Sequence, residues 1–204
     1  MLAAWLFSLP AYSALIQMEH TMPGNDCAGY FGSGFGSCQI FSFDDQQNKV
    51  LLSPVIAKYD IENDGAKTEF NNEIYPSFEG PEISYKLEEQ TWEYTPGKDD
   101  PGIRYVAAKG GNFFKLLWYV DGNTVGDACN SVFTLSCLEL AETVMKGSWT
   151  TPLNENNGKS YGLSHLTFYN SKPPTLVPEP SSLGLIGLGL LGLGFARRRS
   201  SRLN

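Results

Sequence analysis

The chain has 204 residues, 42% of them hydrophobic and 13% aromatic, which is enough to bury one sizeable core. Its formal net charge is −7, and four of its fifteen basic residues stand in the last eight positions. The remainder is acidic and has no basic stripe, which argues against nucleic acid as a partner. Because the chain has two histidines, a histidine-rich metal site is excluded.

Residues 1–13 have the pattern of a signal peptide. An apolar run and a proline lead to small residues, and Ala11-Tyr12-Ser13 fits a small-x-small cleavage site. No Lys or Arg precedes the apolar run, although signal peptides normally have one, so the true start can lie upstream. We expect a mature chain that begins at Ala14; the alternative is that this segment is a strand of the mature protein.

Four cysteines, Cys27, Cys38, Cys129 and Cys137, stand in two clusters. Four cysteines allow three pairings, and the clustering favours Cys27 with Cys38 and Cys129 with Cys137. An exported protein keeps such pairs oxidised. The alternative is a four-cysteine zinc site, but neither cluster has the C-x-x-C spacing common in such sites. We therefore predict two disulfides, each of which closes a short loop.

Residues 14–170 are predicted to form one secreted, mostly β domain. Gly, Pro, Asn or Asp interrupts the chain every eight to twelve residues, and apolar and polar residues alternate between these turns. Many short strands joined by regular turns indicate an antiparallel β-sandwich or jelly roll. The clearest alternating runs are 39–43, 83–88, 92–94, 114–120 and 164–169.

Three stretches depart from the strand pattern. Leu138, Ala141 and Val144 fall at helical spacing, so a short helix is an alternative there. Residues 24–36 are rich in glycine and are predicted to be a loop held by the first disulfide. Residues 171–180 contain four prolines and are typical of an extended stalk.

A possible catalytic motif is weak. Gly158-Lys159-Ser160-Tyr161-Gly162 matches G-x-S-x-G, and His165 follows it. A nucleophile elbow needs a strand before the serine and a helix after it, with the acid and then the histidine arriving from later loops. A strand-like run follows here instead, so we expect no enzyme activity and expect His165 to lie on a strand and hydrogen-bond locally.

We expect the protein to need no cofactor. Its acidic turns make a bound calcium ion the alternative. Asp60, Glu62 and Asp64 resemble the first half of a calcium loop, but Asn71 stands where an EF-hand needs a bidentate glutamate. A looser site on these residues remains an alternative to solvated turns. Two weaker candidates are the pair Asp99-Asp100 and the pair Asp121 with Asp127.

Aromatic residues are the best candidates for ligand binding. An aromatic ring can stack on the C–H face of a sugar, although core packing explains most aromatic residues in a β domain. Tyr30, Phe31 and Phe35 lie among glycines, where backbone can approach a ligand closely. We therefore name these three as candidate carbohydrate contacts.

The C-terminal thirty residues combine three features in order. Val177-Pro178-Glu179-Pro180 precedes residues 183–196, which are all apolar or glycine, and a cluster follows with Arg197, Arg198 and Arg199. A helix of fourteen residues spans about 21 Å, short of a bilayer core of about 30 Å unless flanking side chains extend it. The arginines predict a cytoplasmic C-terminus. The alternatives are a plain membrane anchor and a buried core helix.

This order of motif, apolar segment and basic cluster resembles the PEP-CTERM sorting signal of Gram-negative bacteria that make exopolysaccharide. The resemblance implies that residues 181–204 form a transmembrane helix with an Arg-rich tail. It also implies that an exosortase recognises and cuts the tail at the inner membrane. A transient anchor of this kind delivers the protein to the cell surface or matrix.

The body has a weaker resemblance to other PEP-CTERM proteins. It rests on Trp92-Glu93-Tyr94-Thr95-Pro96-Gly97, on the strand-like segment 106–111, and on residues 163–169 just before the stalk. The resemblance implies a β-sandwich without an assigned activity. We expect a structural or adhesive component of an exopolysaccharide layer or biofilm; the alternatives are a lectin-like module and, remotely, a secreted hydrolase.

Overall fold

The computed structural model describes residues 14–61 and 68–169, all within Met1–Pro174, the first of the chain's two units. Within these ranges no helix is long and apolar enough to cross a membrane. Several predictions lie outside the described residues: the signal peptide, the stalk, the sorting motif, the apolar segment and the Arg cluster.

Short strands make up most of the described fold, in agreement with the predicted class. The elements in chain order are β1 (Leu15–Pro23), η1 (Phe35–Ser37), β2 (Gln39–Phe43), β3 (Lys49–Asp60), β4 (Glu69–Phe70), η2 (Gly80–Glu82), β5 (Ile83–Lys86), β6 (Thr91–Tyr94), β7 (Tyr105–Gly110), β8 (Phe113–Asp121), η3 (Asp127–Cys129), α1 (Leu135–Glu139), β9 (Lys146–Ser148) and β10 (His165–Tyr169).

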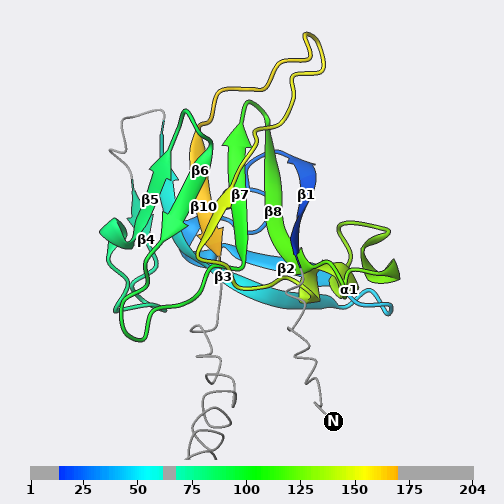
Figure 1. Ribbon diagram of the computed structural model, residues 1–204, viewed down its shortest axis with the longest axis horizontal. Helices are drawn as coiled ribbons and strands as arrows, with labels where there is room; N and C mark the ends of the chain where they lie inside the picture. The colour runs from blue at the N-terminus through cyan, green and yellow to red at the C-terminus, as the bar shows by residue number, and fades with distance from the viewer. Residues whose placement is uncertain (1–13, 62–67, 170–204) are drawn as a thin grey trace, which may run out of the picture. The chain divides into compact units, whose positions relative to one another are not determined.

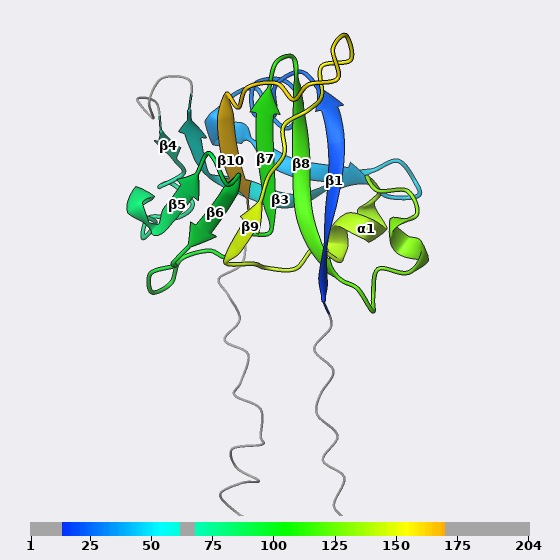
Figure 2. The same ribbon diagram turned by 45° about the horizontal axis from the view of Figure 1, so that its top comes forward.

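Seven of the described strands form one antiparallel sheet. Its order is β1-β8-β7-β10-β3-β2, with β4 also paired to β3. The sheet curls like half of a barrel, so that β3 and β2 run across the direction of β7 and β8 (Figures 1 and 2). The register shifts at Ile40/Phe41 and at Phe168/Tyr169, and such irregularities bend a strand and increase its twist.

Three strands form a second antiparallel sheet, in the order β5-β6-β9. This sheet lies against one face of the curled sheet, in front of β7 and β10 in Figure 2. Between them Trp92 and Tyr94 of β6 pack with Leu166 and Phe168 of β10. Strand β10 is buried along its whole length because it has neighbours on both faces, so even its polar residues His165 and Thr167 are buried.

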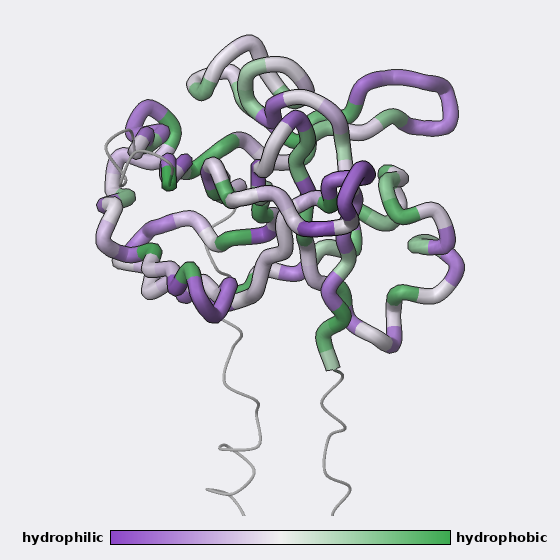
Figure 3. Tube along the Cα trace, turned by 90° about the horizontal axis from the view of Figure 1, so that it is seen from above, coloured by the Kyte–Doolittle hydropathy of each residue, from purple (hydrophilic) through white to green (hydrophobic). Residues whose placement is uncertain are grey.

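The opposite face of the curled sheet forms a separate core. Phe114, Leu116, Trp118 and Val120 alternate along β8 and point into it, as the period of two predicts. The Gly-rich segment 24–36, the residues that follow it to Cys38, and α1 cover this face, and all four cysteines lie in this core. Hydrophilic stretches are found in the loops at the edge of the view in Figure 3.

The mostly β, antiparallel prediction is confirmed, and each of the five alternating runs contains a strand. The helix differs from its expected position. It begins at Leu135, where Thr134 Oγ1 accepts a hydrogen bond from the Cys137 amide, and it ends at Glu139. The chain is then extended, because the amides of Glu142 and Val144 donate to the carbonyls of Tyr119 and Ile103.

Candidate ligand-binding site

A hollow of about 760 Å³ lies between the β2–β3 turn and the segment that carries α1, and we call it the Tyr30 hollow. Three parts of the chain line it: the Gly-rich segment, the end of β2 with its turn, and α1 with the residues before it. The lining residues are Tyr30, Ser42, Phe43, Asp44, Asp45, Gln46, Gln47, Phe133, Thr134, Leu135, Ser136 and Glu139.

Both disulfides support the walls of the Tyr30 hollow. The bond Cys27–Cys38 closes the segment that carries Tyr30, and Cys129–Cys137 ties the residues before α1 to the helix. These are the two predicted pairings, and each spans only 11 or 8 residues of sequence. The described chain has no free cysteine. The covalent closures limit how far either wall can move without unfolding.

Tyr30 is half-buried and is held by other aromatic rings. Its ring makes edge-on contacts with Phe31 at 4.9 Å and with Phe133 at 6.2 Å between centroids, and it stacks on Phe41 at 6.1 Å. Offset-stacked and edge-on arrangements of this kind are the favourable ones. Burial raises the pKa of the Tyr30 phenol, so the hydroxyl remains a neutral donor and acceptor.

The polar side of the hollow is a preorganised turn. Asp44 Oδ1 accepts hydrogen bonds from the amides of Gln46 at 3.0 Å and Asn48 at 2.8 Å, while Oδ2 accepts from Asn48 Nδ2 at 2.9 Å. The Asn48 side-chain hydrogen bond leads the causes that lower the pKa of Asp44. Gln47 has φ 64, a left-handed conformation that suits a tight hairpin. Carboxylate and amide groups are thereby presented beside the aromatic rings.

The structure separates the three predicted carbohydrate contacts. Tyr30 lines the hollow, Phe31 is 3% exposed in the core, and Phe35 is half-buried against the same core. Two aromatic residues were not predicted. Phe43, 50% exposed, could have been found from its place at the end of an alternating strand before a polar turn. Phe133 gave no local signal, because its approach to Tyr30 depends on the tertiary fold.

A second hollow, of about 500 Å³, lies over the three-stranded sheet and includes Trp92 and Tyr119. Trp92 is 2% exposed, and the Tyr119 hydroxyl donates to Gln17 Oε1 at 2.7 Å and accepts from the Ser148 amide at 3.0 Å. Both aromatic groups are therefore already engaged within the protein. The Tyr30 hollow offers more accessible aromatic surface and is the better candidate.

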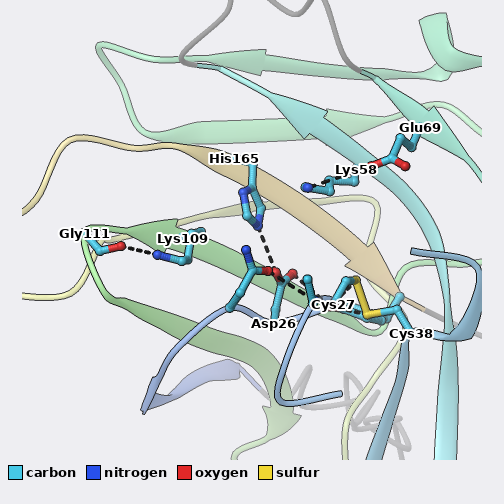
Figure 4. A network of polar contacts seen from close by, with 11 residues as sticks. Asp26, Cys27, Cys38, Lys58, Glu69, Lys109, Gly111 and His165 are labelled. Carbon is cyan, nitrogen blue, oxygen red and sulfur yellow. Dashed lines mark hydrogen bonds and ion pairs between the residues drawn. A yellow bond between two sulfur atoms is a disulfide. The ribbon is translucent and has the colours of Figure 1, made fainter. Parts of the chain in front are cut away.

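His165 takes part in a buried polar network rather than in a catalytic arrangement with Ser160. Its Nε2 lies 2.8 Å from Asp26 Oδ1, and both residues are buried (Figure 4). Tyr169 OH donates to Asp26 Oδ2 at 3.0 Å. The strand position predicted for His165 is correct, but the local hydrogen bond is wrong, because Asp26 is 139 residues away. Ser160 is exposed and pairs through its backbone with Leu153.

The acidic turns considered for calcium mostly have other partners. Asp121 Oδ1 accepts from the Asn123 amide at 2.7 Å, and Asp127 Oδ1 accepts from Asn130 Nδ2 at 3.1 Å. Glu62 and Asp64 lie outside the described residues, so the loop that begins at Asp60 stays a prediction. In the part of the chain that the structure describes, no group of three or more His, Cys, Asp or Glu side chains could hold a metal ion.

The fold and the hollow define an antiparallel β domain, closed by two disulfides, with an aromatic and acidic surface depression. The family model of the PEP-CTERM protein-sorting motif matches residues 176–199, so the chain carries a PEP-CTERM sorting signal. The motif indicates export, processing by an exosortase at the membrane, and an extracellular destination. No curated protein and no solved structure matches the chain.

Proposed function

We propose that this exported protein binds polysaccharide in the Tyr30 hollow and serves as an adhesive component of an exopolysaccharide layer at the surface of a Gram-negative bacterium. Its role is binding rather than catalysis. The observation that carries the proposal is the combination, in one depression, of accessible aromatic rings with a fixed polar turn. A ring can cover the apolar face of a sugar while neighbouring oxygens and amides bond its hydroxyls.

The charge of the hollow suggests which polysaccharides fit. Asp44, Asp45 and Glu139 line it, and no Lys or Arg is among its lining residues. A polysaccharide rich in uronic acids would bring like charges together, which costs binding free energy. The proposal therefore favours neutral or amine-bearing polysaccharides.

Binding to a series of polysaccharides that differ in charge tests the proposal. The oxidised full chain is titrated with a neutral, an amine-bearing and a uronic-acid polymer of similar length, at low and at physiological salt. Saturable binding to the neutral or amine-bearing polymer, with weaker binding to the uronic-acid polymer, supports the proposal. Binding to none of the three, or equal binding to all, contradicts it.

A further inference from the structure

Strand β1 forms one end of the seven-stranded sheet and has a neighbouring strand on one side only. It is the end strand of the sheet order and pairs with β8 (Figure 2). Its register with β8 runs unbroken from Leu15, opposite Asp121, to Pro23, opposite Phe113. Among the described residues no strand pairs with the outer edge of β1, which is therefore open to a partner.

The register also determines which backbone groups of β1 point away from β8. The Gly122 amide donates to the Ala14 carbonyl at 3.1 Å, so the even-numbered residues of the strand bond to β8. Adjacent residues of a strand direct their amide and carbonyl groups to opposite sides, so the odd-numbered residues direct theirs outward. In the part of the chain that the structure describes, the outward backbone groups have no hydrogen-bond partner; they belong to Leu15, Gln17, Glu19 and Thr21.

The outer edge of β1 lacks the features that usually keep an edge strand from pairing, which are proline, lysine, bulges and very short length. Residues 15–22 contain no proline and no lysine, and their one acidic residue is Glu19. The apolar side chains of Leu15 and Ile16 are exposed. Pro23, which has no amide hydrogen, ends the stretch. A regular edge of this length is suited to hydrogen-bond a second extended strand.

A second copy of β1 fits this edge, because the outward groups lie symmetrically about Met18. When two copies run antiparallel with Met18 opposite Met18, Leu15 faces Thr21 of the other copy, and Gln17 faces Glu19. This register places all four outward residues of each strand in hydrogen-bonded pairs, with about eight N–H···O bonds in all, and a shift by two residues in either direction loses pairs.

The facing side chains are compatible as well. The carboxylate of Glu19 faces the neutral amide of Gln17 rather than a second carboxylate, so no like charges are opposed. Ile16, exposed in one copy, faces His20 of the other, whose ring stacks on Phe133 of its own chain at 5.1 Å between centroids. Pairing thus covers an exposed apolar side chain with a ring that is already held in place.

We propose that β1 is a self-association interface, at which two copies of this chain join their seven-stranded sheets into one continuous antiparallel sheet. The inference goes beyond polysaccharide binding and does not depend on it. A dimer carries two Tyr30 hollows, so one dimer can bridge two polysaccharide chains where the proposed function also holds. Because the interface adds one strand pair and buries few side chains, we expect a weak dimer that forms in a concentration-dependent way.

Self-association of the oxidised full chain tests the interface without any glycan. Sedimentation is followed from about 1 μM to 1 mM in a mild detergent, which keeps the apolar segments 183–196 of different chains apart. We expect a monomer–dimer equilibrium. Each copy has a net charge of −7, so the dimer should be weaker at low salt than at about 0.15 M, where the repulsion is screened. A protein that stays monomeric over the whole range overturns the proposal.

The variant Gln17→Glu assigns the dimer to β1. Gln17 Oε1 accepts hydrogen bonds from the Tyr119 hydroxyl at 2.7 Å and from Ser148 Oγ at 2.9 Å, and a glutamate oxygen can accept both, so the fold is retained. In the dimer the new carboxylate faces Glu19 at two symmetric positions and should raise the dissociation constant about tenfold. Gln46→Glu makes the same charge change on the exposed β2–β3 turn and should leave the constant unaltered. Equal dissociation constants for the two variants overturn the proposal.

An introduced cysteine tests the register. The Met18 residues of the two copies form a non-hydrogen-bonded pair with Cα atoms about 4.5 Å apart, which is within the range of a disulfide. Met18→Cys should therefore give a disulfide-linked dimer under oxidising conditions, with both native disulfides verified by peptide mapping. Thr21→Cys is the control, because the two copies of residue 21 lie about 20 Å apart along the strands. No cross-link in Met18→Cys, or equal cross-linking in Thr21→Cys, overturns the proposed pairing.

Discussion

Asp26 and His165 are separated by 139 residues in the chain and meet in the core, with 2.8 Å between Oδ1 and Nε2. Tyr169 OH donates to the other carboxylate oxygen and lies within 3.5 Å of the sulfurs of Cys27 and Cys38. One buried carboxylate thus joins the last described strand to the disulfide-closed segment that carries Tyr30. The stability of this contact and the shape of the Tyr30 hollow are therefore linked.

Breaking the buried pair should destabilise the protein strongly. Asp26→Asn or His165→Gln removes one partner and leaves the other buried without its counterpart, which costs about 3–5 kcal/mol. Urea denaturation of each variant measures the loss. The double variant should lose less than the sum of the two, because the residues interact directly. A loss below about 1 kcal/mol in both single variants would contradict the assigned role.

The same pair predicts how stability changes in acid. Burial alone raises the pKa of Asp26, but the hydrogen bond and charge of His165, together with hydrogen bonds from Thr167 and the Cys27 amide, outweigh it and hold the pKa at about 2, below the usual 3.8. Its contribution to the free energy of unfolding, about 2 kcal/mol, is therefore complete above pH about 4 and is lost as the pH falls toward about 2. Unfolding by urea between pH 5 and 2 checks this. An Asp26→Asn variant should show a shallower decline; an identical slope contradicts the prediction.

The disulfide beside α1 should affect binding as well as stability. Replacing Cys129 and Cys137 together by serine releases a loop of 8 residues and should lower the free energy of unfolding by about 2.5 kcal/mol through chain entropy. It also frees the wall that carries Phe133, so polysaccharide affinity should fall under conditions where the variant is still folded. Calorimetric titration and thermal unfolding separate the two effects. Unchanged affinity would mean that this wall is not part of the site.

The sorting motif predicts a change of location. Replacing Pro178 and Glu179 by alanine should prevent exosortase processing, so the chain accumulates in the membrane fraction with its tail attached. Fractionation of cells and mass spectrometry of the C-terminus measure this. Replacing Pro173 and Pro174 by alanine is the matched control, because these prolines lie outside the matched residues 176–199. Equal processing of both variants would contradict the role of the motif.

The sequence predicts features that depend on neighbouring residues. Both disulfides followed from cysteine spacing, and the strand at 114–120 followed from its alternation, because each is a local pattern. The long strand β3 was missed, since Pro54 and the run Val55-Ile56-Ala57 break the period of two where the sheet curls. The end of the helix at Glu139 was also not predicted. Leu138 and Val144 have helical spacing in the sequence, but they are buried in different cores, so one helix does not contain both.

The candidate site was only partly predictable. Tyr30 was named because it is aromatic and lies among glycines, whereas the burial of Phe31 depends on how that segment folds over β8 and β10. Similarly, nothing near His165 in the sequence indicates Asp26. Their contact depends on the pairing of β10 with β3 and β7 and on the path of the Gly-rich segment. Contacts of this kind arise from tertiary register, which local patterns do not encode.

The most direct test of the account is the affinity of a Phe43→Ala variant for exopolysaccharide from the source bacterium. Phe43 is 50% exposed, so its loss removes aromatic surface from the hollow with little effect on folding. Leu153→Ala is the control, because Leu153 is 58% exposed and lies outside the lining. We predict that Phe43→Ala weakens binding at least about tenfold, consistent with about 1.4 kcal/mol for one stacking contact, and that Leu153→Ala binds as the unsubstituted protein does. Equal affinity of all three proteins would contradict the assignment of the Tyr30 hollow as the binding site.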